Sequence, residues 1–292
     1  MTSAKSLPGG AYKLGDLTVS RVGFGAMQLA GPGVFGPPAN RDEAVAVLRE
    51  AVELGVTHID TADFYGPYVT NEIIHEALAP YAADVHIVTK VGAVRDSAGG
   101  WVHQRTPANL RDQVHSNLRN LKLDALDVVN LRVGGGADGH SPVPESIAER
   151  FGVLAELRTE GLIRHLGLSV VDAEQLAEAQ EIAPVVCVQN FYNIAGREDE
   201  PLLELTARQG IAYVPFFPLG GFTPLQSGTL ASVAARLGAA PQTVALAWLL
   251  QRSPNMLVIP GTSSVAHLRE NVAAGSLSLD DATLAELDAI GS

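Results

Sequence analysis

The fold is decided by the stretch Thr57-His58-Ile59-Asp60-Thr61-Ala62-Asp63-Phe64-Tyr65-Gly66. Its first residues are mostly β-branched and follow a break at Gly55, which predicts a short strand. The strand then passes into a polar turn that carries Asp60, Asp63 and Tyr65. An Asp after a strand is often only a turn former or a helix cap, and a Tyr near a turn is often packing. A catalytic interpretation therefore needs a third group.

Lys90 is the candidate for that third group, because it follows the next short apolar strand, Val85-His86-Ile87-Val88-Thr89. A lysine beside a phenol favours the phenolate, so we expect Lys90 to lower the pKa of Tyr65 from ~10 by roughly one to three units. A carboxylate such as Asp60 would keep the lysine charged and fix its direction. The sequence thus predicts a tyrosine that exchanges a proton near neutral pH.

Outward from this stretch, strand and helix patterns alternate along the chain. A hairpin is expected over residues 11–20, and strands are expected at 21–24, 57–59, 85–89, 125–131, 163–168, 185–189, 211–215 and 256–259. Helices are expected at 41–54, 71–78, 107–121, 144–159, 172–182, 199–209, 229–237, 241–252, 265–273 and 279–290.

This order predicts the α/β class, since strict alternation implies parallel strands with right-handed crossovers. Eight such units suit a single (β/α)8 TIM barrel over residues 1–292, with an N-terminal β-hairpin and extra C-terminal helices. A doubly wound open sheet is the alternative. In a barrel the chemistry lies at the C-terminal ends of the strands, where Asp60, Tyr65 and Lys90 all fall.

The composition argues against some classes of binding partner and site. The net charge of -12 argues against a sequence-independent grip on nucleic acid or on an anionic membrane, since both need clustered Lys and Arg. The single cysteine, Cys187, lies in an apolar run and is expected in the core. The histidines lack metal-ligand spacing, so no metal is proposed. Residues 1–10 show no apolar signal core and no apolar run reaches ~18 residues, so we expect a cytoplasmic protein.

One glycine-rich motif is rejected as a dinucleotide fingerprint. The run Gly31-Pro32-Gly33-Val34-Phe35-Gly36 matches G-x-G-x-x-G literally. In a dinucleotide fold that pattern closes a strand and opens a helix directly. Here prolines lie within and after the run, and the next helix is expected only at Arg41. The run is interpreted as a flexible loop over the barrel mouth.

Polar groups at later strand ends point to a nucleotide cofactor. Ser169, Gln189 and Asn190 could bind a carboxamide such as that of nicotinamide, and Phe216 could stack on a flat ring. The small residues Gly261-Thr262-Ser263-Ser264 precede a helix and suit a phosphate. Each feature is also common in ordinary strand ends and helix caps. Together they describe a nicotinamide dinucleotide laid across the mouth from the fifth strand to the eighth.

The chain resembles the aldo-keto reductases in a series of motifs that occur in the family's order. These are Asp60-Thr61-Ala62-x-x-Tyr65-Gly66, Thr89-Lys90-Val91-Gly92, Gly167-Leu168-Ser169, Val188-Gln189-Asn190, Pro218-Leu219-Gly220 and Ile259-Pro260-Gly261-x-Ser263 with Glu270-Asn271. They span almost the whole chain. The stretches 28–38, 130–132 and 214–226 are most similar to the bacterial pyridoxal reductase branch.

The resemblance implies a role for each matched catalytic position. Tyr65 would be the general acid for carbonyl reduction, Lys90 would tune it, and Asp60 would pair with Lys90. The family's histidine after the fourth strand is replaced here by Arg132, which is always charged and forked. Arg132 could polarise the carbonyl oxygen, bind a substituent next to it, or only pair with a loop carboxylate. This substitution leaves the substrate class open.

The resemblance also implies NADP(H) as the cofactor and a small aromatic aldehyde, foremost pyridoxal, as the substrate. The cofactor positions are Gly25, Ala26, Met27, Ser169, Gln189, Asn190, Phe216, Pro218, Leu219, Gly221, Gly261, Thr262, Ser263, Ser264, His267, Glu270 and Asn271. The substrate pocket is expected to contain Phe24, Met27, Phe35, Phe64, Trp101 and Phe217.

Two departures from the family affect the cofactor. Val170 replaces a frequent Asn, and His267 replaces an Arg that in some relatives lies over the adenosine 2′-phosphate. Ser263 and Ser264 could still bind that phosphate, so NADPH is preferred to NADH. The competing functions are a reductase of sugars, ketones or other aldehydes, and an NADPH-binding regulatory subunit. A monomer or a weak homo-oligomer is expected.

Overall fold

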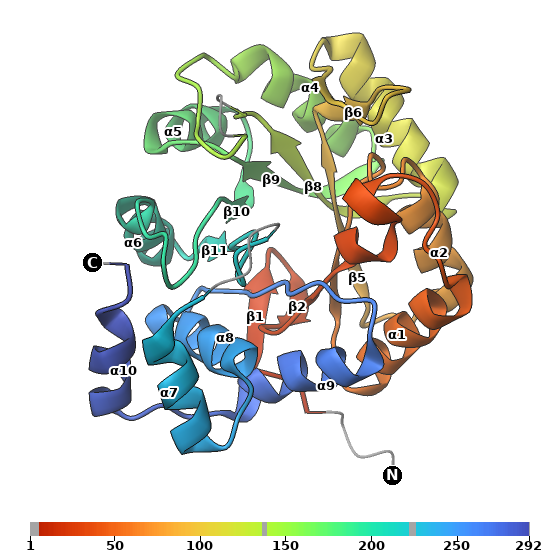
Figure 1. Cartoon of the computed structure of the whole chain (residues 1–292). Helices are drawn as coiled ribbons and strands as arrows, with labels where there is room; N and C mark the ends of the chain where they lie inside the picture. Colours follow the sequence, from red (N-terminus) through yellow and green to blue (C-terminus); the bar gives the residue numbers. More distant parts are fainter. Residues whose placement is uncertain (1–5, 136–138, 222–225, 292) are drawn as a thin grey trace.

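Seven parallel strands form one curled sheet in a computed structural model that describes residues 6–135, 139–221 and 226–291. The sheet order is β11–β10–β9–β8–β5–β4–β3, with every neighbouring pair parallel (Figure 1). The strands are β3 Phe24–Gly25, β4 His58–Asp60, β5 His86–Val91, β8 Leu126–Arg132, β9 Ile163–Ser169, β10 Val185–Gln189 and β11 Ala212–Tyr213. The predicted barrel order of the chain is therefore confirmed.

The eighth predicted strand, residues 256–259, follows the expected path but makes no ladder. It is joined to the sheet by isolated parallel bridges on both sides, Tyr213 to Met256 and Val22 to Val258. The Leu257 amide donates to the Tyr213 carbonyl over 2.9 Å, and the Gly23 amide donates to the Val258 carbonyl over 2.8 Å. Because successive residues bond to opposite neighbours, this segment links the two edges of the sheet and closes the ring.

Ten α-helices of the described chain surround the sheet. They are α1 Arg41–Glu53, α2 Val69–Leu78, α3 Pro107–Leu121, α4 Ala148–Thr159, α5 Ala173–Ile182, α6 Glu200–Gln209, α7 Gly228–Leu237, α8 Pro241–Arg252, α9 Val265–Ala273 and α10 Asp281–Asp288. Local chemistry sets several starts. Thr106 caps α3 by accepting from the Asn109 amide, and Asp172 forms a capping box with Gln175 at α5.

Helix α4 begins four residues later than the predicted Pro144. The preceding segment is held by side chains of α5 instead. Glu178 accepts hydrogen bonds from the Ile147 amide and the Ser146 hydroxyl, and the Gln175 side-chain amide donates to the carbonyls of Val143 and Glu145. These long-range bonds use backbone groups that a helix would otherwise pair, so periodicity alone overestimated its length.

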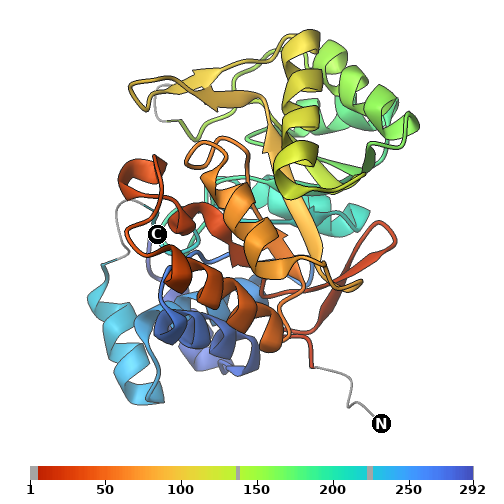
Figure 2. The ribbon, with the colours of Figure 1, turned by 90° about the vertical axis from the view of Figure 1, so that its right-hand side faces the viewer.

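The N-terminal hairpin, β1 Ala11–Leu14 and β2 Leu17–Ser20, covers the end of the barrel opposite the active-site mouth (Figures 1 and 2). Its apolar side chains Leu14, Leu17 and Val19 pack against inward-facing residues of the barrel strands, such as Val88 and Val128. This cluster seals the barrel interior at that end. The main core lies between the strands and α1 to α5, and a second cluster surrounds α7, α8 and α10.

A second hairpin was not expected from the sequence. It consists of β6 Ala93–Arg95 and β7 Trp101–His103, paired antiparallel beyond the end of β5. The signal for it was the turn Asp96-Ser97-Ala98-Gly99-Gly100 between two short runs. The Asp96 carboxylate closes that turn by accepting from the amides of Ala98 and Gly100.

The loop 31–36 is not a dinucleotide motif, as predicted, since no helix starts at its end. It contains the short 3-10 helix Pro32–Val34, and another, Ala26–Leu29, precedes it. Backbone bonds tie it down, from Gly31 to the Gly36 carbonyl and from Gly36 to the Gly66 carbonyl. Of the family-like stretch 214–226, residues 222–225 lie outside the described residues.

Within the described residues, no single helix has the length and apolarity to cross a membrane. Helices α7 and α8 reach those limits only when taken together, and they are bent by 94° at the break between them.

Candidate active site

A cavity of about 600 Å³ opens at the end of the barrel where the parallel strands finish. Among the predicted residues that line it, the charged and amide side chains come from the ends of β4, β5, β8 and β10, and the rings come from β7 and the loops after β4 and β11. The predicted site residues that line it are Gly25, Met27, Asp60, Phe64, Tyr65, Lys90, Trp101, Arg132, Gln189, Phe216, Phe217, Pro218, Leu219, Gly221 and Gly261. Lining residues that the sequence did not single out as site residues include Gln28, His103 and His140.

Asp60, Lys90 and Tyr65 meet in this cavity. The Lys90 ammonium donates to Asp60 Oδ1 over 2.6 Å and to the Thr61 carbonyl over 3.0 Å. Its nitrogen also lies 5.1 Å from the centre of the Tyr65 ring. The side chains of Lys90 and Asp60 are each only 4% exposed. A buried pair of this kind persists because each charge has several partners, and here they hold the lysine beside the phenol.

The protonation states follow from burial and from these neighbours. Burial raises the pKa of the Tyr65 phenol above its usual 10 and outweighs the opposite effect of Lys90. The expectation that Lys90 brings this pKa towards neutrality is therefore wrong for this structure. The free energy needed to remove a phenolate from water exceeds the stabilisation that it gains from the Lys90 ammonium. Burial alone would lower the pKa of Lys90, but Asp60 and Tyr65 raise it. At neutral pH, Tyr65 is a neutral phenol beside a charged lysine.

Gln189 and Ser169 lie next to each other at the ends of β10 and β9. The Gln189 side-chain amide donates to Asp60 Oδ2 over 2.8 Å, which links it to the Asp60–Lys90 pair. Among the described residues, Gln189 Oε1 and Ser169 Oγ are buried and have no hydrogen-bond partner. A buried acceptor beside a buried hydroxyl is costly unless something binds it, and the two fit the amide of a nicotinamide.

Asn190 does not serve as a carboxamide contact, contrary to the sequence-based expectation. Its side-chain nitrogen donates to the Val171 carbonyl and to Asp199, and its side-chain oxygen accepts from the Val171 amide. These bonds use the side chain to hold the loop after β9. Asp199 is half-buried, and this desolvation raises its pKa to about 6. The side chain of Asn190, one position beyond Gln189, is thus used in bonds within the protein.

Three other predicted residues lie away from the cavity lining. Phe24 is fully buried in the main core, because its side chain points outward from the strand towards the helices. Ala26 is likewise buried in that core. Phe35 is 37% exposed, and its ring lies 5.4 Å from the Arg95 guanidinium. Phe24 and Phe35 were expected in the substrate pocket and are not part of its lining.

The predicted phosphate end lies on the loop before α9. Thr262 accepts from the Ser264 amide and shapes the turn, and Ser264 is the residue before the helix. The side chains of Ser263, His267 and Glu270 are exposed, whereas Asn271 is buried. Gly25 must be glycine, because a Cβ there would lie 2.4 Å from the Ile259 carbonyl oxygen. The loop residues 261–264 thus place small and hydroxyl groups at the N-terminus of α9, which suits a phosphate.

An aromatic wall bounds the cavity beside Tyr65; we use this name for Phe64 and Trp101. The Phe64 ring meets the Tyr65 ring edge to face at 5.3 Å, and the Trp101 ring meets Phe64 in the same way at 5.7 Å. Phe216 and Phe217 lie on the loop after β11, with ring centres 5.4 Å apart. Rings next to a polar centre favour a flat apolar ligand with a polar end.

Asp63, also part of the opening stretch, has a structural role. It accepts hydrogen bonds from Asn71, Ser116 and Asn120, which join the loop after β4 to α2 and α3. Burial raises the pKa of Asp63, while those three donors oppose the shift. The network fixes the backbone that carries Tyr65.

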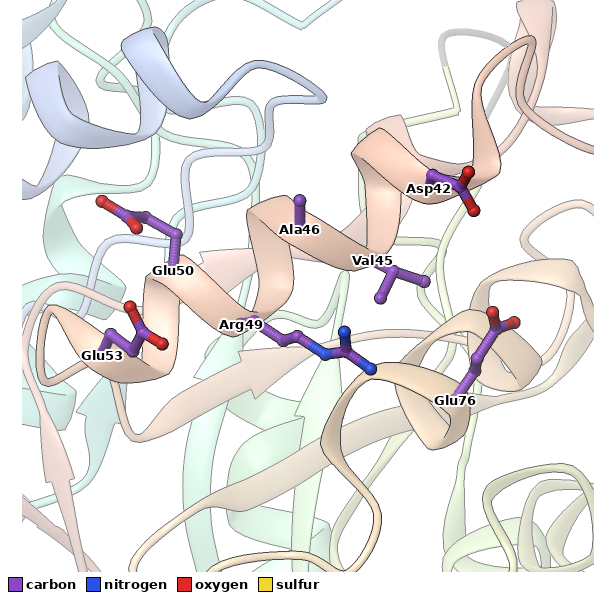
Figure 3. A pocket seen from close by; sticks show the side chains of 7 residues that line it. All are labelled: Asp42, Val45, Ala46, Arg49, Glu50, Glu53 and Glu76. Carbon is purple, nitrogen blue, oxygen red and sulfur yellow. The ribbon is translucent and has the colours of Figure 1, made fainter.

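A separate hollow lies on the outer face of α1 (Figure 3). Its charged residues are Asp42, Arg49, Glu50, Glu53 and Glu76, and none of the catalytic candidates lines it. Among the described residues, no group of three or more His, Cys, Asp or Glu side chains is arranged so that it could hold a metal ion. This surface hollow is therefore distinct from the chemistry at the barrel mouth.

Comparison with known proteins identifies the family. The model of the aldo/keto reductase family matches residues 21–292. The chain belongs to the aldo/keto reductase family. It is 62% identical to the pyridoxine 4-dehydrogenase of Escherichia coli over 279 residues, which cover 96% of this chain and 97% of the relative.

Solved structures of aldo-keto reductases agree with the fold of this family member. A thermostable aldo-keto reductase in complex with the inhibitor epalrestat is 31% identical, with a TM-score of 0.80 and coverage of 96% of this chain and 99% of the other. An aldo/keto reductase from Klebsiella pneumoniae in complex with NADP and acetate is 26% identical, with a TM-score of 0.76 and coverage of 93% and 91%. The resemblance read from the motifs is thereby confirmed for the whole chain.

Arg132 occupies the place of the histidine expected in an aldo/keto reductase. It ends β8, is half-buried, and donates from Nη2 to the Gly139 carbonyl over 3.0 Å. Its guanidinium carbon lies 5.8 Å from the Phe216 ring centre. Burial lowers the pKa of Arg132, and the nearby Tyr65 opposes the shift. A forked cation therefore lies at the same cavity wall as the phenol.

Proposed function

We propose that this aldo/keto reductase reduces pyridoxal, or a closely similar small aromatic aldehyde, with NADPH. The observation that carries the proposal is the 62% identity over nearly the full length of a relative named pyridoxine 4-dehydrogenase. Its support in the structure is the cavity in which Asp60, Lys90, Tyr65 and the aromatic wall come together. NADP in a related solved structure supports the cofactor assignment.

Three residues would carry the proton transfer, and two others would hold the cofactor. NADPH supplies the hydride when it is bound. Tyr65 donates its phenolic proton to the carbonyl oxygen as the alcohol forms, and the charged Lys90 stabilises the phenolate left behind. Asp60 holds Lys90 in position through the 2.6 Å bond. Gln189 and Ser169 would orient the nicotinamide amide through their unpaired buried oxygens.

Arg132 would stabilise charge on the substrate rather than transfer a proton. An arginine stays charged at every physiological pH, so it cannot replace histidine as an acid. Its N–H groups can donate to the carbonyl oxygen or to an oxygen substituent on the neighbouring ring carbon. The hydroxyl oxygen on the ring carbon next to the one that bears the aldehyde of pyridoxal offers such an acceptor. This role suits a substrate that is flat and carries an oxygen near its carbonyl.

The adenosine end of NADPH would lie at the start of α9. Ser263, Ser264 and His267 would bind the adenosine 2′-phosphate, and Glu270 with Asn271 would bind the adenine edge. Residues 1–292 would act as one catalytic domain, as a monomer or weak homo-oligomer in the cytoplasm. The alternative functions stay a reductase of other aldehydes, ketones or sugars, and a regulatory subunit that binds NADPH.

The deciding experiment follows NADPH oxidation by absorbance with pyridoxal, using wild type and Tyr65→Phe side by side. Removing the proton donor should lower kcat by roughly two to four orders of magnitude. The dissociation constant of NADPH should change less than twofold, since the hydroxyl contacts the substrate carbonyl. Activity with other aldehydes but not with pyridoxal would refute the substrate assignment. Tight NADPH binding without any turnover would favour the regulatory alternative.

A further inference from the structure

Arg95 joins the β6–β7 hairpin, which contributes to the cavity lining, to the loop 33–34. It ends β6, in the hairpin that the sequence did not reveal, and its side chain reaches the loop around Val34. Nη1 donates to the Val34 carbonyl over 2.7 Å, and Nη2 donates to the Gly33 carbonyl over 3.0 Å. Figure 2 shows both segments projecting at the same end of the barrel.

The same guanidinium also closes its own hairpin. Nε and Nη2 of Arg95 both donate to the Gly99 carbonyl, over 3.1 Å and 2.7 Å. One planar group thus holds three carbonyls from two segments about sixty positions apart in the chain. Lysine could not reproduce this arrangement, because its ammonium lacks the rigid fork.

The face of the Arg95 guanidinium lies on Trp101. Its central carbon is 4.1 Å from the Trp101 ring centre, a close cation–π distance. Trp101 is 48% exposed, and short two-stranded hairpins are marginal by themselves, so burial does little to fix this ring. Arg95 therefore supplies the orientation that packing alone does not.

The contacts continue from Trp101 to the proton donor. Trp101 packs edge to face on Phe64, and Phe64 packs edge to face on Tyr65. Trp101, Phe64 and Tyr65 all line the cavity, whereas Arg95 does not. An arginine outside the cavity thus determines where the aromatic wall stands relative to the reacting phenol.

We propose that Arg95 is a positioning residue that sets the preference of this enzyme for flat aromatic aldehydes. Its bonds to the loop 33–34 and its stacking on Trp101 keep the aromatic wall at the distance that a planar ring needs beside Tyr65. A small aliphatic aldehyde does not use that wall, so its reduction is independent of Arg95. The preference rests on the proposed reductase function, but the position of Trp101 does not.

The experiment compares Arg95→Lys, which keeps the charge, with Arg95→Met, which removes charge and fork. Arg236→Met is the matched control, because Arg236 is an exposed arginine paired with Glu286 on the far helices. For each protein, kcat and KM are measured with pyridoxal, 4-nitrobenzaldehyde and propanal. Calorimetry gives the dissociation constants of the aromatic aldehydes and of NADPH, so the comparison does not depend on turnover.

Both Arg95 variants should raise KM and the dissociation constant for the two aromatic aldehydes about tenfold, as expected for lost ring contacts. The values for propanal and NADPH should change less than twofold, and Arg236→Met should match wild type. Acrylamide should quench tryptophan fluorescence more strongly in both Arg95 variants, since Trp248 is buried and Trp101 would lose its cover.

Equal losses for aromatic and aliphatic substrates, or no loss in either variant, would overturn the proposal. Wild type that reduces 4-nitrobenzaldehyde but not pyridoxal would refute the pyridoxal assignment only, and the ratio between aromatic and aliphatic substrates would still decide on Arg95. If wild type reduces no aldehyde, the proposed reductase function is refuted. The role of Arg95 is then tested by the dissociation constants and by the quenching of Trp101 fluorescence. If Arg95→Met does not fold, Arg95→Lys carries the comparison.

Discussion

The two ends of the barrel interior differ in chemistry although the same strands build both. On β5, Val88 lies at the closed end and Lys90 lies at the open end, two residues further. On β10, Cys187 and Gln189 show the same change. Residues two apart in a strand point to the same side, so one two-residue step along these strands changes the interior from apolar to polar or charged.

What differs between the ends is what covers them. At the closed end, Leu14, Leu17 and Val19 of the N-terminal hairpin fill the space and leave no partner for a charge. At the open end, Lys90 has Asp60 and the Thr61 carbonyl, and Asp60 also has Gln189. A barrel tolerates buried ions only where such a network satisfies them. The comparison leads to four tests.

The largest effect should come from breaking the buried pair at the open end. Lys90→Met leaves the Asp60 carboxylate buried without its cation, so the free energy of unfolding should fall by about 3–5 kcal/mol. Activity should also be lost, because Tyr65 no longer has a cation to stabilise its phenolate. Chemical denaturation at pH 7 and the NADPH assay measure the two effects.

The double variant Asp60→Leu, Lys90→Met serves as the control for that pair. Removing both charges makes the open end resemble the closed end, and at least half of the lost stability should return. Activity should stay absent. A double variant that is less stable than Lys90→Met would show that the network contributes more than charge compensation. It would contradict the explanation given for the difference between the two ends.

His58, two residues before Asp60 on β4, offers a further test. It is fully buried, both ring nitrogens lack a hydrogen-bond partner among the described residues, and burial lowers its pKa from 6.5 to about 4. The unfolded chain therefore binds this proton first, and stability is lost as pH falls from 6.5 towards 4. At pH 5 the loss should be about 2 kcal/mol relative to pH 7.5.

Replacing the ring shows whether His58 causes that loss. His58→Leu should be about 2 kcal/mol less sensitive to the change from pH 7.5 to pH 5 than wild type in urea denaturation. A variant with the same acid sensitivity as wild type would assign the loss to other groups.

The pH dependence of carbonyl reduction tests the raised pKa of Tyr65 at the open end. Because the pKa of Tyr65 is raised above 10, the acid form needed for reduction is complete at pH 7 to 9. Reduction should therefore show no loss of kcat/KM over this range, and should fall only as pH rises through the pKa. Oxidation of the alcohol needs the phenolate and should rise by up to about tenfold per pH unit. A reduction rate that falls steadily from pH 7 would contradict the raised pKa.

The smallest effect is expected at the closed end. Cys187→Ala removes one buried sulfur and its contact to Asn130, and should cost about 1 kcal/mol with kcat unchanged. Burial raises the pKa of the thiol to about 12, so native protein should also resist alkylation at pH 8. Rapid labelling, or a loss of activity in the variant, would show that the closed end is not a sealed apolar interior.

The sequence by itself determined the repeating units and the central group of catalytic candidates. Periodicity located the helices, with bounds correct to the residue for α3, α8 and α9. It also placed Asp60, Tyr65 and Lys90 at the ends of adjacent strands, because parallel strands bring their C-terminal ends together. Local patterns suffice where a short segment fixes its own structure and the topology follows from alternation.

Only the tertiary structure decided which neighbours each side chain has. Phe24 is in the core and not the pocket, Asn190 holds a loop, and burial outweighs Lys90 in setting the pKa of Tyr65. The segment 256–259 closes the ring by single bridges, and Arg95 reaches a loop about sixty residues away. Burial and long-range hydrogen bonds depend on segments far apart in the chain, and residue spacing within one segment does not contain them.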